Sequence, residues 1–511
     1  MKRLYLFWMI VAIGVSACVP IQPEATAAQP DAATQMTTDS AAMAQQSLLY
    51  NERVNRSPGI SSSDVDQLNV IWFAPTDGMI SHRALLGDGR IYVADWDGMV
   101  YAIDPQSGRE LWKQQVEQNV QSGWPWYGFA GSGDFGEGKL YEASVEGSAY
   151  AIDPETGDVL WETSISDDQY AGNVGQMRYY DGMVYIGLSS VEEVLAQTEG
   201  ITPTFQGGVV ALNAQDGSVA WKRPLVEAPH TGVAVWSSFA LDPQMNALFF
   251  TTGNNYTGNA TSLSDSIVAV NAKTGEILWN YQVTPDDVWT LSAPVGPDYD
   301  FGGGPQLFDA TIDGQTRHLV GAGQKSGFYS VFDRETGEHV WSTYVGYGGV
   351  GGGIRGEASV ADGKIYLWSN NAYADGQPPE EYPLTVRALD AATGASEWFQ
   401  DKIQPANSSS AGFLANDVYF VDSLNGVVQA YRAGDGKILW HAKLPGAIGA
   451  PLWVSGDTLY VAAGLPEAFG QMKSTNGLYA FSPSGSPVTD TTVVTGIGPL
   501  ASTEVMTSTQ P

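Results

Sequence analysis

The sequence is poor in cysteine, in basic residues and in histidine. Its 511 residues include one cysteine, Cys18, so intrachain disulfides, a CxxC zinc site and a CxxCH haem attachment are excluded. Lysine and arginine total 24 against 56 aspartates and glutamates, and a formal net charge of −32 argues against nucleic acid as a partner. The five histidines show no metal-ligand spacing.

Common catalytic signatures are also missing. The glycine-rich stretch GYGGVGGGIRG at 346–356 lacks the Lys-Ser/Thr of a phosphate-binding P-loop, so we interpret it as loop glycine. No GxSxG nucleophile elbow is present. Beyond the N-terminus, no stretch is long and apolar enough to span a membrane.

The two ends of the chain differ from its middle. Residues 1–17 have the pattern of a signal peptide, and Cys18 follows Val-Ser-Ala as in a bacterial lipobox; the alternative is an ordinary signal peptide with a chance cysteine. A lipobox predicts an exported protein whose only membrane attachment is a lipid on Cys18, at the outer face of a bacterial membrane. We expect residues 18–46 to form a flexible tether and residues 484–511 a disordered tail.

One motif recurs through the middle of the chain. It has the form Ala-x-Asp/Asn-x-x-x-Gly-x-x-x-Trp, and its closest copies are AIDPQSGRELW at 102–112, AIDPETGDVLW at 151–161, ALNAQDGSVAW at 211–221 and AVNAKTGEILW at 269–279. Looser copies end at Trp341, Trp398 and Trp440. A fixed motif at this period indicates a repeat architecture.

Each repeat is expected to hold four short strands. Alternating Val, Ile and Tyr bounded by Asp-Gly or Asn-Gly predict hairpins before most copies of the motif. The motif glycine suits a turn with positive φ, and the tryptophan suits an outermost strand where its ring packs between sheets. Seven motif tryptophans mark seven blades, and LNVIWF, with Trp72, would complete an eighth. We therefore predict an all-β, eight-bladed β-propeller over residues 47–483, with the N-terminal strand closing the last blade.

Long loops, which we place on one face of the propeller, carry candidate ligands from three consecutive blades. These are Glu192 and Glu193 in GLSSVEE, Asn254 and Asn255 in TTGNNYTGN, and Asp298 and Asp300 in GPDYDFGGG. Carboxylate and amide oxygens are ligands for a hard cation such as Ca²⁺. Lys325, in GQKSG, is a candidate donor to an anionic or quinone oxygen, and Trp236 offers a flat stacking surface. Each residue alone is ordinary surface or core, so the prediction depends on their convergence on one face.

These interior segments resemble the pyrroloquinoline quinone (PQQ)-dependent alcohol dehydrogenases, most closely the polyvinyl alcohol dehydrogenase-like branch. GVAVWSSFALDP, TTGNNYTGN, TPDDVW, GPDYDFG and AGQKSG occur in the family's order, and the resemblance covers about residues 50–482. It implies hydride transfer from an alcohol, which could be secondary or polymeric, to PQQ beside a divalent metal. Ca²⁺ is expected, with a lanthanide left open. A separate acceptor, such as a cytochrome c or a quinone, would take the electrons.

By position, the resemblance implies a role for each candidate. Glu192, Asn254 and Asp300 would bind the metal, Trp236 would stack under the quinone, and Lys325 would hydrogen-bond its oxygens. In methanol dehydrogenases the catalytic Asp directly follows a Trp, whereas here Thr290 follows Trp289. We therefore assign the base to Asp300, and Asp298 could add a metal ligand.

Two other functions fit the same repeats. A lipid-anchored eight-bladed propeller also resembles the lipoprotein of the outer-membrane barrel-assembly machinery, a cofactor-free scaffold that binds proteins. The third hypothesis is a quinoprotein that has lost its cofactor. The long insertions and the GNN and GQKSG motifs favour the dehydrogenase over the scaffold.

Overall fold

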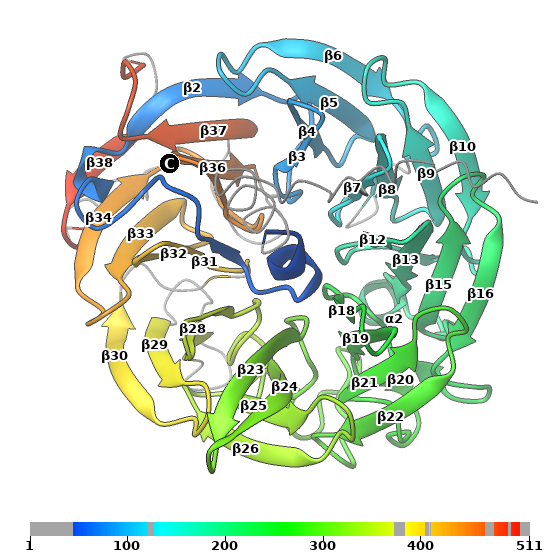
Figure 1. Cartoon of the computed structure of the whole chain (residues 1–511). Coiled ribbons are helices and arrows are strands. Elements are labelled where there is room, and N and C mark those ends of the chain that lie inside the picture. Colours follow the sequence, from blue (N-terminus) through cyan, green and yellow to red (C-terminus); the bar gives the residue numbers. More distant parts are fainter. Residues whose placement is uncertain are drawn as a thin grey trace, which may run out of the picture. The chain divides into compact units, whose positions relative to one another are not determined.

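The structure is a computed structural model that describes residues 44–120, 127–371, 384–403, 408, 410–464, 475–488 and 492–500. The predicted signal peptide, Cys18 and most of the predicted tether lie outside these residues. In the described part, eight sheets, each built on four antiparallel strands, follow one another around a ring, which confirms the predicted eight-bladed propeller (Figure 1). Among the described helices, none combines the length and apolar character needed to cross a bilayer.

Blades 1 to 4 each have four strands in chain order from the axis outward. They are β3 (Leu85–Gly87), β4 (Arg90–Ala94), β5 (Met99–Ile103) and β6 (Glu110–Gln115); β7 (Asp134–Gly136), β8 (Lys139–Ala143), β9 (Ser148–Ile152) and β10 (Val159–Ser164); β12 (Arg178–Tyr180), β13 (Met183–Gly187), β15 (Gly208–Asn213) and β16 (Val219–Pro224); β18 (Ala240–Asp242), β19 (Ala247–Thr251), β21 (Ser266–Asn271) and β22 (Ile277–Gln282).

Blades 5 to 8 complete the ring. Their strands are β23 (Gln306–Ile312), β24 (Gln315–Gly323), β25 (Phe328–Asp333) and β26 (His339–Tyr344); β27 (Ser359–Ala361), β28 (Lys364–Asn370), β29 (Leu384–Asp390) and β30 (Ser396–Ile403); β31 (Phe413–Ala415), β32 (Val418–Asp422), β33 (Val427–Arg432) and β34 (Ile438–Lys443); β35 (Trp453–Ser455), β36 (Thr458–Ala463), β37 (Gly477–Ser482) and β2 (Asn69–Pro75). Because β2 pairs with β37, the N-terminal strand closes blade 8 as predicted.

The repeated tryptophan and glycine join each blade to the next. Seven indoles donate a hydrogen bond of 2.8–3.2 Å to a main-chain carbonyl of the following blade; they belong to Trp72, Trp112, Trp161, Trp221, Trp279, Trp398 and Trp440. The motif glycine of the following blade lies under the ring: a Cβ on Gly275, at φ 67°, would sit 2.5 Å from Trp221. The tryptophan and the glycine of the motif therefore form the contact between neighbouring blades.

Blade 7 gains a strand at each edge. On the inside, β1 (Val54–Asn55) runs parallel to β31, and on the outside β38 (Val494–Ile497) runs antiparallel to β34. The sequence predicts disorder throughout 484–511, and this is wrong for β38. Its main chain satisfies the open edge of β34, an interaction that composition does not reveal.

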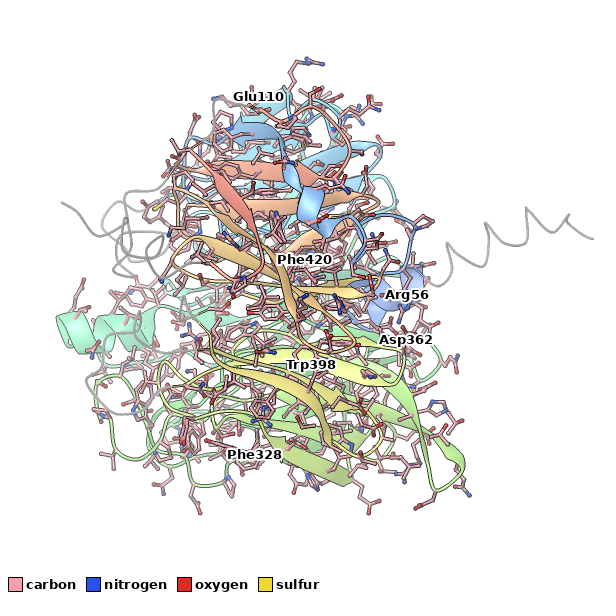
Figure 2. All side chains as sticks on the ribbon, turned by 90° about the vertical axis from the view of Figure 1, so that its left-hand side faces the viewer. Arg56, Glu110, Phe328, Asp362, Trp398 and Phe420 are labelled. Carbon is pink, nitrogen blue, oxygen red and sulfur yellow. The ribbon has the colours of Figure 1, made fainter. Side chains whose placement is uncertain are left out.

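The N-terminal segment 44–55 lies at the centre of the ring (Figure 1). Residues 44–49 are helical, and Asn51 and Arg53 follow with positive φ. The Asn51 amide donates to Ser238 Oγ of blade 4, and the Arg53 guanidinium donates to the carbonyls of Gly412 and Leu452 in blades 7 and 8. Figure 2 shows Arg56, just after this segment, on the side of the ring opposite to α2 (Glu192–Glu199).

Candidate functional site

A cavity of about 170 Å³ opens where the insertions of blades 3, 4 and 5 meet. We call it the site cavity. The residues that line it include Glu193, Trp236, Asn254, Asp300 and Lys325, together with the apolar side chains of Val174, Val194, Tyr256, Trp289 and Leu291. A mostly apolar cavity with a few convergent polar groups is the usual form of a cofactor site. Four predicted site residues, Trp236, Asn254, Asp300 and Lys325, therefore lie together.

Short secondary-structure elements hold the loops that carry these residues. Outside the blades, β11 (Ala171–Gly172) pairs with β14 (Ser189–Ser190), and β17 (Thr231–Gly232) pairs with β20 (Asn255–Thr257). Asn254 lies just before β20, and its amide donates to the Trp289 carbonyl at 2.8 Å. Through this bond, the loop of blade 4 is fixed to the segment that leads into blade 5.

Lys325 bridges two buried carboxylates. Its Nζ lies 2.6 Å from Asp300 Oδ1 and 3.0 Å from Asp298 Oδ2, and 5.5 Å from the centre of the Trp236 ring. The side chains of Asp298 and Asp300 are 1% and 4% exposed, so water screens these ion pairs little. Asp300 lines the site cavity, whereas Asp298 is behind Lys325 and does not line it.

Acidic groups outnumber bases around the cavity. Burial alone would lower the pKa of Lys325, but Asp300 and Asp298 outweigh that effect and raise it. Burial, with Asp300 beside it, raises the pKa of Asp298 to about 8 although Lys325 pulls it down. The pKa of Glu193 is also raised, first by burial and then by Asp300, and the same two causes raise the pKa of Asp265. These buried carboxyl groups therefore resist ionisation, an effect that a nearby cation would oppose.

Glu192, the predicted metal ligand of blade 3, does not line the site cavity. Its carboxylate turns back onto its own loop and accepts hydrogen bonds from the main-chain N–H groups of Thr204 and Phe205, at 2.8 and 2.7 Å. Glu193 lines the cavity instead, accepting from the Leu291 N–H at 3.0 Å and from the Asn254 amide at 3.4 Å. The reason is α2, whose first turn points successive side chains about 100° apart. The Glu-Glu pair in the sequence indicated that a glutamate of this loop lines the site, but not which of the two.

The carboxylates around the site cavity do not form a compact metal site in this structure, as far as the described residues show. Within the described ranges, no three carboxylate, imidazole or thiol side chains converge at ligand distance. Glu193, Asn254 and Asp300 nevertheless line one cavity and present the oxygens that a hard cation takes.

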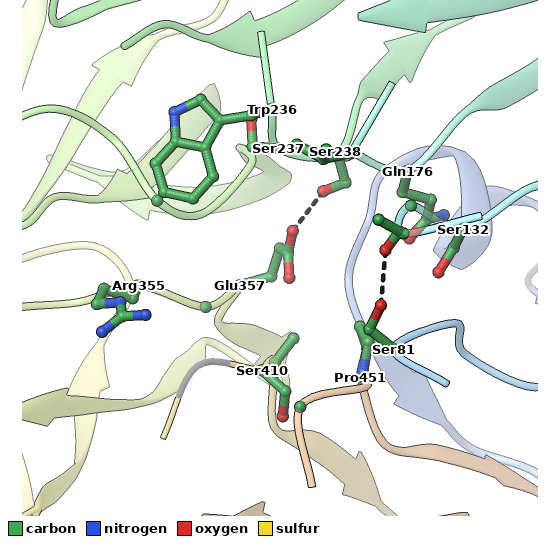
Figure 3. A pocket seen from close by; sticks show the side chains of 18 residues that line it. Ser81, Ser132, Gln176, Trp236, Ser237, Ser238, Arg355, Glu357, Ser410 and Pro451 are labelled. Carbon is green, nitrogen blue, oxygen red and sulfur yellow. Dashed lines mark hydrogen bonds between the residues drawn. The ribbon is translucent and has the colours of Figure 1, made fainter. Parts of the chain in front are cut away.

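A second cavity lies on the axis of the propeller and shares Val174 and Trp236 with the first. Segments that lead into all eight blades line this axial cavity, which is rich in serine hydroxyls (Figure 3). Glu357 accepts from Ser238 Oγ at 2.7 Å, while no described residue forms a hydrogen bond or ion pair with Arg355. Burial lowers the pKa of Arg355, and Asp298 and Asp300 oppose this. Sequence reasoning missed Arg355 because it follows glycines interpreted as loop.

Two family models match this chain. The model described as the β-propeller domain of glucose/ethanol/alcohol dehydrogenase matches residues 221–344, and the model described as outer membrane protein assembly factor BamB matches residues 60–279 and 384–488. The second covers more than half of the chain. The first covers the segment that contains Trp236, Asn254, Asp300 and Lys325.

The similar proteins include two polyvinylalcohol dehydrogenases. That of a Pseudomonas sp is 27% identical over 77% of this chain and 66% of its own length, and that of Sphingopyxis sp. (strain 113P3) is 27% identical over 85% and 75%. The chain belongs to the propeller family that the second model describes, and it is similar to polyvinylalcohol dehydrogenases over most of its length. The resemblance found in the sequence is thereby confirmed. Even so, the chain spans less than two thirds of the length of the first of these relatives.

A solved alcohol dehydrogenase shares the fold. The quinohemoprotein alcohol dehydrogenase from Comamonas testosteroni superposes with a TM-score of 0.71 over 86% of this chain and 80% of that one, at 20% identity. At this identity, the likeness supports the propeller architecture alone.

Proposed function

We propose that the protein oxidises an alcohol with PQQ as the electron acceptor and that the reaction takes place in the site cavity. The observation that carries the proposal is the meeting of Trp236, Asn254, Asp300 and Lys325 in one cavity of a propeller that is similar to polyvinylalcohol dehydrogenases. None of these side chains is adjacent to another in the sequence, so the fold has brought them together.

The residues present suit an anionic, flat cofactor. Trp236 supplies an aromatic ring that lines both cavities, and the Lys325 ammonium, 5.5 Å from the centre of that ring, can donate to a quinone oxygen. Arg355, in the axial cavity, is a candidate partner for the carboxylates that PQQ carries. When bound, the quinone supplies the hydride acceptor, and the protein positions the alcohol and excludes water.

Glu193, Asn254 and Asp300 are the proposed ligands of a divalent cation, with Ca²⁺ expected and a lanthanide left open. The buried carboxyl groups around Lys325 resist ionisation, and a cation would oppose this effect. A bound cation would act as a Lewis acid on a quinone carbonyl. Glu193 replaces Glu192 in this proposal because only Glu193 lines the cavity.

Asp300 is the proposed general base. Its carboxylate lines the cavity beside Lys325, whereas Asp298 does not line the cavity and burial raises the pKa of Asp298 to about 8. The proton of the alcohol hydroxyl would pass to Asp300 while Lys325 keeps that carboxylate oriented. Asp298 then serves to hold Lys325.

The similar proteins support the proposed substrate class, and the electron acceptor is part of the proposal. Similarity to polyvinylalcohol dehydrogenases supports a secondary or polymeric alcohol, and a separate acceptor such as a cytochrome c or a quinone would remove the electrons. Export and lipid attachment at Cys18 remain part of the proposal; a Cys18→Ser variant that still incorporates labelled fatty acid in cells would contradict it.

Reconstitution tests the function. Purified protein is mixed with PQQ and Ca²⁺, and reduction of a redox dye is followed with and without a secondary alcohol. We expect alcohol-dependent reduction that Asp300→Ala abolishes while the variant stays folded. Quinone binding without turnover would favour a quinoprotein that has lost its activity. No quinone binding at all would favour the scaffold function, which the match to the assembly-factor model supports.

A further inference from the structure

The glycine-rich segment 346–353, which connects blade 5 to blade 6, packs directly on the main chain of Lys325. Gly349 N–H donates to the Lys325 carbonyl at 3.1 Å. Directly after the segment, Ile354 N–H donates to the carbonyl of Gln324, the residue before Lys325, at 3.0 Å. We call residues 346–353 the glycine clamp.

Two glycines of the clamp leave no room for a side chain. A Cβ on Gly353 would lie 2.2 Å from the Lys325 carbonyl oxygen and 2.6 Å from its Cα, and a Cβ on Gly348 would lie 2.6 Å from the same oxygen. Ordinary carbon contacts begin near 3.4 Å, and the opposing atoms here are main chain, which cannot swing aside. An alanine at Gly353 therefore requires Lys325 to move by about 1 Å.

The clamp is fixed from its other side by blade 6. Gly353 and Asn370 exchange two main-chain hydrogen bonds of 2.9 Å, and the Asn370 amide also donates to the Gly351 carbonyl. Asn371 Oδ1 accepts from the Tyr347 N–H at 3.0 Å. Because β28 holds the clamp, the clamp is a rigid wall against which the turn that carries Lys325 is set.

We propose that the glycine clamp is a positioning element for Lys325. Lys325 N–H also donates to the Asp300 carbonyl at 3.1 Å, so the residue is held by its main chain on two sides. From this fixed main chain, the side chain extends over Trp236 to Asp298 and Asp300. The part of the glycine clamp in the reaction rests on the proposed function, whereas the effect of the clamp on Lys325 does not.

Three variants of the full chain test the clamp. Gly353→Ala and Gly348→Ala each place a methyl group against Lys325. Gly363→Ala is the matched control, since Gly363 has φ 72° against 70° for Gly353 but no atom within 4 Å of its Cβ position. The control carries the backbone strain of an alanine at positive φ without the collision. If Gly353→Ala does not fold, Gly348→Ala still tests the collision with Lys325, because the φ of Gly348 is not positive.

The first measurement needs no cofactor. Each protein is treated with an amine-reactive reagent, and labelling of Lys325 is followed by peptide mass spectrometry with the exposed Lys113 as reference. We expect both clamp variants to label Lys325 at least about tenfold faster than wild type, because a displaced side chain opens to solvent more often. The Gly363→Ala control should match wild type. Equal labelling of Lys325 in all four proteins would overturn the proposal.

The second measurement is turnover after reconstitution. Displacement of a reacting group by about 1 Å costs roughly 100-fold in rate, so we expect such a loss in the clamp variants and full activity in Gly363→Ala. Faster labelling with unchanged turnover would keep the clamp as the element that holds Lys325 and would remove Lys325 from the proposed reaction. The two failures are therefore distinguishable.

Discussion

Replacing Lys325 with Met should destabilise the metal-free protein strongly, because it removes the only cation in contact with Asp298 and Asp300 among the described residues. Both carboxylates are almost fully buried, so neither can turn to water. Loss of one partner from a buried ion pair costs about 3–5 kcal/mol. Met is unbranched and apolar and keeps most of the length of Lys, so the main change is the loss of the charge.

The loss should depend on pH with a definite sign. The folded-state pKa of Asp298, about 8, lies above its ordinary value, mainly because of burial. Such a carboxyl favours the folded state while it is protonated, and that contribution is lost as pH rises through about 8. Without Lys325, Asp298 loses the group that pulls its pKa down and resists ionisation still more, so the deficit should be largest above about pH 8 and should shrink toward about pH 5.

Urea unfolding with a chelator present, at about pH 5 and about pH 9, measures this difference. Lys113→Met is the control, since Lys113 forms an ion pair of 2.9 Å with Asp77 that is exposed on both sides. We expect that control to unfold almost as wild type does. A Lys325→Met variant no less stable than Lys113→Met at the higher pH, or a deficit that grows as pH falls, would refute the reasoning.

Three further predictions follow from individual contacts. Glu193→Gln should weaken Ca²⁺ binding by at least about tenfold in calorimetric titration, because the site loses a charged ligand, whereas Glu192→Gln should keep that affinity and lower the melting temperature; equal effects of the two would count against Glu193. Arg53→Met should lower the free energy of unfolding by about 2–4 kcal/mol, since it leaves two buried carbonyls without a donor, and the exposed Arg56→Met serves as its control in the same urea assay. Burial raises the folded-state pKa of Asp422 to about 7 against Ser408, Ser410 and Arg53, so wild type should lose stability as pH rises from about 4 through about 7, and an Asp422→Asn variant with the same slope would be evidence against this.

The fold could be predicted because its signal repeats. Each copy of the motif brings a tryptophan and a glycine that meet in the next blade, as Trp221 and Gly275 do, so a local pattern encodes the inter-blade contact. The additional strands of blade 7 had no such signal. The pairing of β38 with β34 joins segments far apart in sequence, and nothing in the composition of the tail indicates it.

The site could be predicted only to the nearest loop. Trp236, Asn254, Asp300 and Lys325 meet because propeller geometry brings the loops of neighbouring blades to one face. Which of two adjacent glutamates lines the cavity depends on the first turn of α2. Successive side chains of a helix point about 100° apart, so Glu193 faces the cavity and Glu192 faces its own loop. Arg355 and the glycine clamp were missed because glycine-rich sequence predicts turns and not what the turns pack against.

The most direct test of the account is an equilibrium titration of PQQ into the metal-free chain, with and without Ca²⁺, followed by the quenching of tryptophan fluorescence. If Glu193, Asn254 and Asp300 hold a cation against a quinone stacked on Trp236, wild type should bind one quinone per chain, tightly only with the cation, and both Trp236→Ala and Asp300→Ala should lose this binding. Quinone uptake that is indifferent to the cation and unchanged in both variants would contradict it.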